Sequence, residues 1–420
     1  MLTMFFAAAL IGSGTAAVPP ASTAPASAGQ VNKAADFAQP GSDIQIISNT
    51  EIIIEGVTYN SWEQVGIHSD YFRQDHTRCG TNELLLQAFD QVDTAGSNDC
   101  SFSNTNIRDI YDPLVEKYRI PVVVHVIQRT NGTGAMTDER VQSQIDILNE
   151  DFQALQGTNG APGNDAQIEF YLATEDPSGN PTSGITRSTN NTWFNDGGAY
   201  YNTLAWNTNR YLNIYSNNGG GALGYVPDLP QGDIAGSNSD RVVILYSTFG
   251  RNAPFSPFNL GRTVTHEVGH YLGLFHTFNG GCGSSNCYTS GDRICDTNPE
   301  SSPTGGCPGS RTSCGTQAPI HNYMDYSDDR CMNQFTVEQN NRMRCSLLNY
   351  RPNLFELATP ALPCNDSDVA LPYGELDFLD INAFLVDFLA GEGLGDLNND
   401  SNYDFLDISM FLGAYSNGCP

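Results

Sequence analysis

The pattern of apolar and polar positions changes sharply at residue 118. The run YRIPVVVHVI, residues 118–127, is rich in β-branched residues and predicts a buried strand. Thr137 is placed to cap a helix that runs to Leu155, with one apolar face formed by Val141, Ile145, Leu148 and Phe152. Three later runs predict strands: IEFYLA at 168–173, RYLNIY at 210–215 and RVVILY at 241–246. This order, followed by a second helix, predicts a mixed α/β (α+β) domain with a mixed sheet.

The residues before 118 have a different character. Residues 1–17 contain an apolar stretch, MFFAAALIG, and then small residues, a pattern that resembles a secretory signal peptide. Neither Lys nor Arg precedes this stretch, so the alternatives are a misplaced start codon or an unusual leader. Residues 18–40 are rich in Ala, Pro, Ser and Gly and read as a linker, and the mixed pattern that follows reads as a pro-segment. We therefore expect a signal peptide at 1–17, a linker and pro-segment at 18–117, and release from the cell.

The C-terminal region contains a duplication. The segments LDFLDINAFLVDFLAG and YDFLDISMFLGAYSNG recur at a spacing of 27 residues. In the second copy, positions 1, 3, 5, 7, 9 and 12 of a calcium loop are occupied by Asp396, Asn398, Asp400, Asn402, Asp404 and Asp407. The first copy keeps Asp377 and Asp380 but carries Pro372 and one extra residue, so we expect weak or no calcium binding there. The boundaries predict one domain at 118–358 and a small helical module at 364–420.

Composition narrows the class of protein. A net charge of −28 argues against nucleic acid as a partner, because phosphates would be repelled. The acidic surface serves either solubility alone or calcium binding. Eleven cysteines, seven of them between Cys282 and Cys345, predict an oxidised, disulfide-stapled protein with at least one thiol that has no intramolecular partner.

Residues 266–276 read HEVGHYLGLFH. On a helix, His266 and His270 project from the same face and can share a metal ion. Glu267 lies beside the first ligand, within reach of water at the metal. Gly273 can adopt a positive φ, which ends the helix and returns His276 as a third ligand. Three imidazoles leave one position open, as in a catalytic zinc site.

Two other interpretations compete with the catalytic site. An amphipathic helix with incidental histidines explains Leu272, Leu274 and Phe275 as core residues, but it requires neither Glu267 nor Gly273. A structural zinc site usually has four protein ligands, and no fourth ligand follows nearby in the sequence. Both are disfavoured against the catalytic site.

The run GRTVTHEVGHYLGLFHTF, the later GDRICDT and the segment NYMDYSDDRCMNQFT together resemble the pappalysin (cytophagalysin-like) family of metzincin proteases. The upstream pieces ILNEDF, DPSGNPTSGITR, RYLNIY and LGYVP are also similar to that family. The resemblance spans residues 118–350 and implies a zinc-dependent endopeptidase with two subdomains and a cleft between them.

The resemblance also implies roles for particular residues. Met324, placed 48 residues after His276, matches the methionine turn beneath the zinc, and Tyr326 matches a tyrosine that ligates zinc at rest and then stabilises the oxyanion. Taken alone, Met324 is equally a core residue. Structural calcium is implied at Asp292, Asp296 and Thr297, which otherwise read as turn residues. Some pappalysins carry an acidic residue directly after the cysteine of this segment and favour basic substrates; here Met332 follows Cys331, which argues against that preference.

Arg78-Cys79-Gly80 lies well before the catalytic region. A thiolate from Cys79 could fill the open zinc position and keep a precursor inactive, as in other metzincin precursors that contain this tripeptide. The odd cysteine count favours such a free thiol. The alternative is a disulfide between Cys79 and Cys100.

The duplicated module resembles a dockerin, which in its family binds a cohesin partner and Ca²⁺. Cys364 and Cys419 bracket the module and are expected to pair. Two function classes follow from the sequence: a secreted, latent zinc endopeptidase, or a calcium-dependent binding or scaffold protein with an inactive protease domain. Glu267 separates the two, because the mechanism needs it and this chain keeps it.

Overall fold

The computed structural model describes most of the chain from residue 44 onward. The described residues are 44–67, 71–72, 77–81, 117–283, 286–288, 290–358, 364–370, 376, 378–391, 393–398 and 400–419. The predicted signal peptide, the linker and Cys100 lie outside them.

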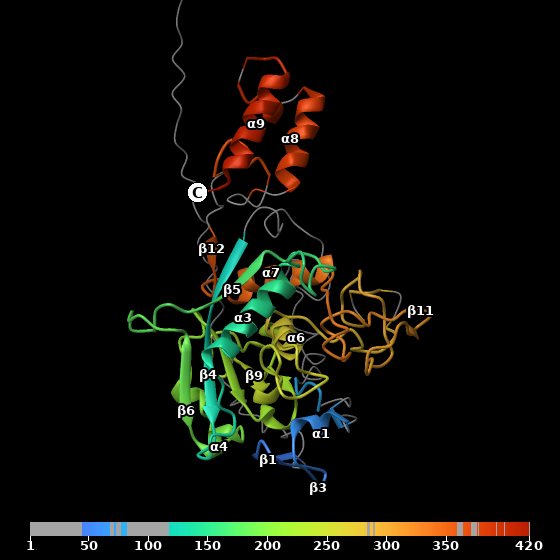
Figure 1. The fold of residues 1–420 in the computed structure, drawn as a ribbon. Helices are drawn as coiled ribbons and strands as arrows, with labels where there is room; N and C mark the ends of the chain where they lie inside the picture. The colour runs from blue at the N-terminus through green and yellow to red at the C-terminus, as the bar shows by residue number, and fades with distance from the viewer. Residues whose placement is uncertain are drawn as a thin grey trace, which may run out of the picture. The chain divides into compact units, whose positions relative to one another are not determined.

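A seven-stranded mixed sheet organises the chain from residue 117 to residue 358 (Figure 1). Its order is β12-β4-β7-β9-β8, and β5 and β6 pair with β4 as well. The β4 strand pairs in parallel with β5, β6 and β7, as β7 does with β9, whereas β12 and β8 are antiparallel to their neighbours. The strands are β4 (Lys117–Gln128), β5 (Ile168–Leu172), β6 (Ile185–Thr189), β7 (Leu212–Asn217), β8 (Gly224–Tyr225), β9 (Val242–Leu245) and β12 (Glu356–Ala358).

All four strands predicted from the sequence are present, and the expectation of a mixed α/β fold is confirmed. Alternate residues of β4 and β9 face opposite sides of the sheet, as the period of two requires. Val124 and Ile244 belong to the core on one face, whereas Ile127 and Leu245 belong to the core on the other. Both faces are therefore covered, which explains the nearly continuous apolar runs.

Helices α3 (Asp138–Phe152) and α6 (Arg262–Tyr271) cover the first face and contribute Val141, Ile145, Val264 and Val268 to its core. The side chain of Thr137 caps α3 by accepting a hydrogen bond from the backbone N–H of Arg140. The helix stops at Phe152, three residues before the predicted end. Ala154 adopts φ +48°, which breaks the helix and leaves Leu155 exposed.

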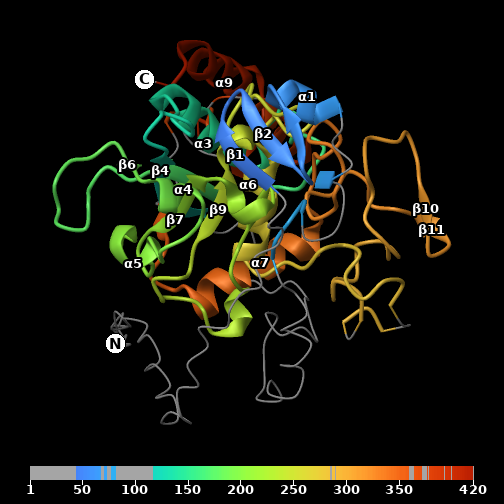
Figure 2. The same cartoon turned by 90° about the horizontal axis from the view of Figure 1, so that it is seen from below.

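Residues of the predicted pro-segment cover the second face. They form the antiparallel sheet β1 (Ile44–Ser48), β2 (Glu51–Ile54) and β3 (Val57–Tyr59), followed by helix α1 (Trp62–Ile67), drawn in blue in Figure 2. Trp62 packs against Phe255, with ring centroids 4.9 Å apart, and its indole N–H donates to the hydroxyl of Tyr246 at 2.9 Å. This segment therefore shares a hydrophobic core with the seven-stranded sheet.

Helix α7 (Val337–Tyr350) and several short elements complete this part of the chain. Helix α7 begins with a capping box formed by Thr336 and Gln339. The other elements are α4 (Asn191–Phe194), α5 (Tyr201–Leu204), η4 (Gly219–Gly221), η5 (Pro230–Gly232), η6 (Tyr246–Thr248), β10 (Thr312–Ser313) and β11 (Thr316–Gln317).

The C-terminal module is a pair of helices, α8 (Phe378–Ala390) and α9 (Phe405–Asn417), with the short η7 (Gly393–Gly395) between them. Phe384 and Phe411, which occupy equivalent positions in the two repeats, stack with centroids 4.3 Å apart. The disulfide Cys364–Cys419 joins the ends of the module, as expected. A small core and one crosslink thus hold the two repeats together.

Candidate metal centre

Three histidines meet at the C-terminal end of α6. His266 and His270 lie one turn apart on the helix, with their Nε2 atoms 3.2 Å apart. The Nε2 atom of His276 lies 3.1 Å from each of them. All three side chains are buried. The spacing seen in the sequence thus becomes a triangle of nitrogen atoms.

The third histidine returns because the chain reverses at Gly273, where φ is +95°. The backbone N–H of Leu274 donates to the carbonyl of Gly269 at 3.0 Å and closes the turn. A Cβ atom at position 273 would lie 2.6 Å from Oγ of Ser346, so both the backbone and the packing require glycine.

The hydrogen bonds of the far ring nitrogens test whether a metal fits this triangle. Nδ1 of His266 lies 2.6 Å from the carbonyl oxygen of Tyr323, and Nδ1 of His270 lies 2.8 Å from that of Leu274. A carbonyl oxygen only accepts, so each Nδ1 carries the proton and each Nε2 presents a lone pair. The Nε2 atoms of His266 and His270, which carry these lone pairs, are 3.2 Å apart. A cation at the centre satisfies them, and tetrahedral Zn–N bonds of about 2.0–2.1 Å are compatible with the observed separations.

Electrostatics keeps the site in its neutral form. Burial lowers the pKa of His266 well below its ordinary value, and the neighbouring His270 and His276 lower it further. Neutral imidazole is the form that binds metal ions.

Glu267 follows the first histidine and is fully buried. Its Oε2 atom lies 3.2 Å from the hydroxyl of Thr81 and 3.5 Å from Sγ of Cys79. A Cβ atom at Gly224 on β8 would lie 2.7 Å from Cγ of Glu267, so this strand approaches the carboxylate closely. The Glu267 side chain is held between Gly224 on β8 and residues 79–81.

Met324 and Tyr326 lie close to the histidine triangle. A Cβ atom on Gly269 of α6 would stand 2.4 Å from the Met324 sulfur, so the methionine packs directly against the helix. The ring of Tyr326 is centred 4.9 Å from that of His276 and 5.8 Å from that of His266. The segment after α6 therefore supports the histidines and places a phenol beside them.

Cys79 is buried and forms no disulfide. Its sulfur and one nitrogen from each of His266, His270 and His276 all lie within 4.8 Å of one another. Burial raises the pKa of the Cys79 thiol well above its ordinary value, and the charge of Glu267 raises it further. With Cys79 free, this structure does not contain the alternative Cys79–Cys100 pair.

Backbone and side-chain contacts hold the tripeptide around Cys79 in place. The N–H of Gly80 donates to the carbonyl of Gly224 at 2.9 Å, and the N–H of Leu223 donates to that of Thr77 at 3.1 Å. The guanidinium of Arg78 lies over the Phe258 ring, 3.2 Å from the hydroxyl of Thr263 and 3.6 Å from Asp329. Arg78 also lies 3.9 Å from the sulfur of Met332. These contacts hold Cys79 beside the three histidines.

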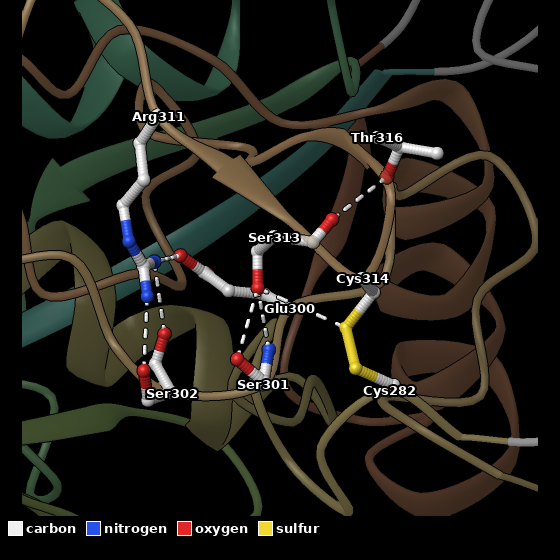
Figure 3. The surroundings of a disulfide bond; sticks show 8 residues. All are labelled: Cys282, Glu300, Ser301, Ser302, Arg311, Ser313, Cys314 and Thr316. Atoms are coloured by element: carbon white, nitrogen blue, oxygen red, sulfur yellow. Dashed lines mark hydrogen bonds and ion pairs between the residues drawn. A yellow bond between two sulfur atoms is a disulfide. The ribbon is translucent and has the colours of Figure 1, made fainter.

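The loop after His276 is stapled by three disulfides, Cys282–Cys314, Cys287–Cys295 and Cys307–Cys331. Figure 3 shows the first of them beside Ser313, which contacts Ser301, while Arg311 pairs with Glu300. The buried carboxylate of Glu300 also accepts a hydrogen bond from Thr277, the residue after His276, at 3.1 Å. The stapled loop is thus linked to the third histidine.

Only two of the three calcium candidates in this loop come together. The hydroxyl of Thr297 donates to Asp292 at 2.6 Å, whereas Asp296 accepts from the backbone N–H of Glu338 at 2.9 Å. Burial raises the pKa of Asp292 to about 7.

Hydrogen bonds from backbone N–H groups to carboxylates close the C-terminal loop. Asp396 accepts from the N–H groups of Asp400 and Ser401 at 3.0 and 2.8 Å, and Asp407 accepts from those of Asn398 and Asp404 at 3.2 and 3.0 Å. Ser401, at loop position 6, adopts φ +67°, where calcium loops turn sharply.

The other candidate ligands contact the backbone of the same loop. Asn398 and Asp400 accept from the N–H groups of Asp400 and Asn402 at 2.9 and 2.8 Å. Asp404 accepts from that of Leu406 at 2.8 Å. In the first repeat, Asp380 accepts from Val369 and Ala370, and Asp377 lies outside the described residues.

Sequence reasoning gave no role to Thr81, Gly224 or Asp151, all of which contact the active-site helix or Glu267. Gly224 and Asp151 lie within the family-like pieces LGYVP and ILNEDF, which was the available signal. Their roles depend on which segments fold against α6, and the spacing of residues in the sequence does not predict those tertiary contacts.

Comparison with known proteins agrees with this geometry. The family model of peptidase M43, described as pregnancy-associated plasma protein-A, matches residues 199–348. An extracellular metalloprotease of Colletotrichum graminicola is 39% identical over 242 residues, which cover 55% of this chain and 77% of that protein. Another from Verticillium alfalfae is 38% identical over 286 residues, covering 65% of this chain and 91% of that protein.

Among solved structures, a promirolysin mutant of Tannerella forsythia aligns with a TM-score of 0.54 and 34% identity, covering 66% of this chain and 96% of that chain. Within the described residues, no helix has the length and apolar character needed to cross a membrane. The fold, the buried histidine triangle and these relatives together identify the chain as a member of the peptidase M43 (pappalysin) family, a metalloendopeptidase related to extracellular enzymes.

Proposed function

We propose that His266, His270 and His276 hold a catalytic zinc ion and that Glu267 is the general base of peptide-bond hydrolysis. The observation that carries this proposal is the triangle of three buried Nε2 atoms, 3.1–3.2 Å apart. When bound there, zinc lowers the pKa of water and polarises a peptide carbonyl.

The protein's own groups perform the remaining steps. Glu267 accepts a proton from the attacking water and delivers it to the leaving amine, which requires a carboxylate beside the first histidine. Tyr326 is a donor beside His276 that stabilises the developing oxyanion. Gly273 allows the turn that brings His276 back to the site. Met324 packs against α6, which carries the other two histidines.

The chain is proposed to be made as a latent precursor. Its signal peptide is residues 1–17, its linker and pro-segment are residues 18–117, and its catalytic domain is residues 118–358. Cys79 supplies a fourth ligand from the pro-segment, and Thr81 and Arg78 fix that segment on Glu267 and Asp329. Proteolysis between Asp112 and Arg119 frees the pro-segment to dissociate from the catalytic domain. Secretion agrees with the extracellular relatives and with the disulfides.

Calcium is proposed at two places. In residues 364–420, a dockerin-like module, the loop carboxylates from Asp396 to Asp407 surround the turn at Ser401. In the catalytic domain, Asp292, Asp296 and Thr297 are candidate ligands, and Asp292 and Thr297 are already in contact.

Exposed apolar residues lie on both helices of the module, among them Phe378, Leu389 and Phe405. A cohesin-like partner on this surface would tether the enzyme at a cell surface.

The experiment that tests the enzyme is chelator-sensitive proteolysis. The purified precursor, nicked between its pro-segment and catalytic domain, is incubated with casein before and after removal of metal with 1,10-phenanthroline. We expect the chelator to abolish hydrolysis and stoichiometric Zn²⁺ to restore it. Hydrolysis that is unaffected by metal removal would refute the proposal.

A further inference from the structure

A fully buried carboxylate lies behind the metal centre. Asp151, at the C-terminal end of α3, accepts hydrogen bonds from the hydroxyl of Thr265 at 2.6 Å and from the hydroxyl of Tyr323 at 2.8 Å. The guanidinium of Arg262 lies 3.0 Å from the same carboxylate. All four residues are buried, and their contacts join α3, α6 and the segment that precedes Met324.

These contacts reach His266 from two directions. Thr265 is its neighbour on α6, so the bond from Thr265 to Asp151 fixes the turn of helix that carries the histidine. The backbone carbonyl of Tyr323 lies 2.6 Å from Nδ1 of His266, while the hydroxyl of Tyr323 donates to Asp151. The same carboxylate therefore holds both the helix and the carbonyl that orients the imidazole.

The charge at Asp151 is compensated inside the core. Burial raises its pKa, whereas Arg262 and the two hydroxyl donors lower it. The backbone N–H of Arg262 is bound in turn by Asp329 at 3.2 Å. A buried ion pair with several hydrogen bonds has one favoured geometry and loses much when a partner is removed.

We propose that Asp151 is a positioning residue for the metal site: through Tyr323 and Thr265 it sets the orientation and tautomer of His266. The inference rests on the proposed function of the three histidines. Partners that orient metal-binding histidines typically affect metal affinity or activity by about 10–100-fold when they are removed. Asp151 is 114 residues away from its partner Thr265 in sequence, and it acts through another side chain rather than on the substrate.

The test uses the full-length chain and three near-isosteric changes, Tyr323→Phe, Thr265→Val and Asp151→Asn. Tyr323→Phe removes one oxygen atom and leaves the backbone carbonyl in place. Tyr215→Phe is the matched control, because it removes a buried hydroxyl that makes no hydrogen bond. Thr265→Ser is the conservative control, because it keeps the hydroxyl that Asp151 accepts. Thermal unfolding confirms that each variant is folded.

Three quantities are measured: the zinc dissociation constant by chelator competition, the visible spectrum of the Co²⁺-substituted protein, and kcat and KM after activation. We expect Tyr323→Phe and Thr265→Val to raise the dissociation constant about 10-fold or more, to shift the Co²⁺ bands and to lower kcat about 10-fold, with KM within about 2-fold. Tyr215→Phe and Thr265→Ser should resemble the wild type.

The outcomes separate the two proposals. If the wild type binds zinc and the folded Tyr323→Phe and Thr265→Val proteins match it within about 2-fold in all three measurements, the positioning role is wrong and the metal centre stands. If the wild type itself binds no zinc, both fail. If Asp151→Asn does not fold, the two hydroxyl variants still decide the question.

Discussion

Gly269 and Met324 are in contact across the active-site helix, where an added Cβ atom would stand 2.4 Å from the methionine sulfur. No side-chain rotation of an alanine relieves such an overlap, so either the sulfur or the helix must move. Because His266 and His270 flank this glycine on α6, a small shift of the helix disturbs the histidine triangle. Met324 thus packs against the helix that carries His266 and His270 only because residue 269 has no side chain.

Gly269→Ala should therefore weaken metal binding and lower the thermal midpoint. An overpacked core costs about 1–3 kcal/mol, more than the gain from replacing a helical glycine. Gly413→Ala in α9 is the control, because nothing lies within 4 Å of its added Cβ atom. Scanning calorimetry and zinc titration compare the two. If Gly269→Ala is at least as stable as the wild type and binds zinc with unchanged affinity, the Met324 side chain can move aside and the prediction is wrong.

Removal of the general base should separate binding from chemistry. Glu267→Ala keeps all three imidazoles, so the purified variant should still fold and carry about one zinc ion. Casein hydrolysis should fall by several orders of magnitude, because the proton acceptor is lost. Activity within a few-fold of the wild type, at equal zinc content, would contradict the mechanism.

Latency should depend on Cys79. The intact precursor should be inactive, whereas Cys79→Ala should cleave casein or itself, because the fourth position is then open to water. Arg78→Ala should weaken latency less, since Cys79 remains and the contacts that are lost, among them those with Asp329 and Phe258, do not involve the metal-binding histidines.

The control for the latency experiment is a disulfide map of the unreduced precursor by mass spectrometry. We expect Cys79 to be recovered as a free thiol. A Cys79–Cys100 peptide in good yield, or a Cys79→Ala precursor that stays inactive at full zinc occupancy, would exclude this thiol as the cause of latency.

Calcium removal should destabilise the C-terminal module before the catalytic domain. Without a cation, the carboxylates of Asp396, Asp400, Asp404 and Asp407 repel one another. The segment 360–420 should gain helical circular dichroism when millimolar Ca²⁺ replaces chelator. Asp396→Ala should not respond, because it removes the first loop position. Identical spectra of the unmodified segment with and without Ca²⁺ would rule out this site.

Acid should destabilise the catalytic sheet through His125. This buried side chain contacts Thr186 and Asn213, and burial lowers its pKa to about 4. The unfolded chain, with an ordinary histidine pKa near 6.5, binds the proton first, so stability is lost as pH falls from about 6.5 toward 4. The loss between pH 7 and pH 5 is about 2 kcal/mol. His125→Phe should be less stable at pH 7 but lose less on acidification, measured by urea unfolding at both pH values.

The sequence predicted the strands, the first helix and the histidines because each depends on a local period. Alternation places Val124 and Ile127 on opposite faces, and the spacing of four places His266 beside His270. The end of α3 was misplaced because the left-handed conformation of Ala154 has no signal in the sequence.

The contacts behind the site were not predictable in the same way. Asp151 meets Tyr323 across 172 residues, and Cys79 meets Glu267 across 188. Such pairs form only when the complete sheet brings the segments together. Charge and residue type alone do not determine them.

The pro-segment core formed by Ile46, Trp62 and Phe72 has a consequence for the timing of activation. Those side chains are buried against the second face of the catalytic sheet, so cutting the chain leaves them in place. The nicked protein is then a non-covalent complex of two pieces, and activity appears at the rate at which they part. Activation should therefore show a lag after scission, and the final activity should rise on dilution or when the detached piece is digested, because both prevent rebinding.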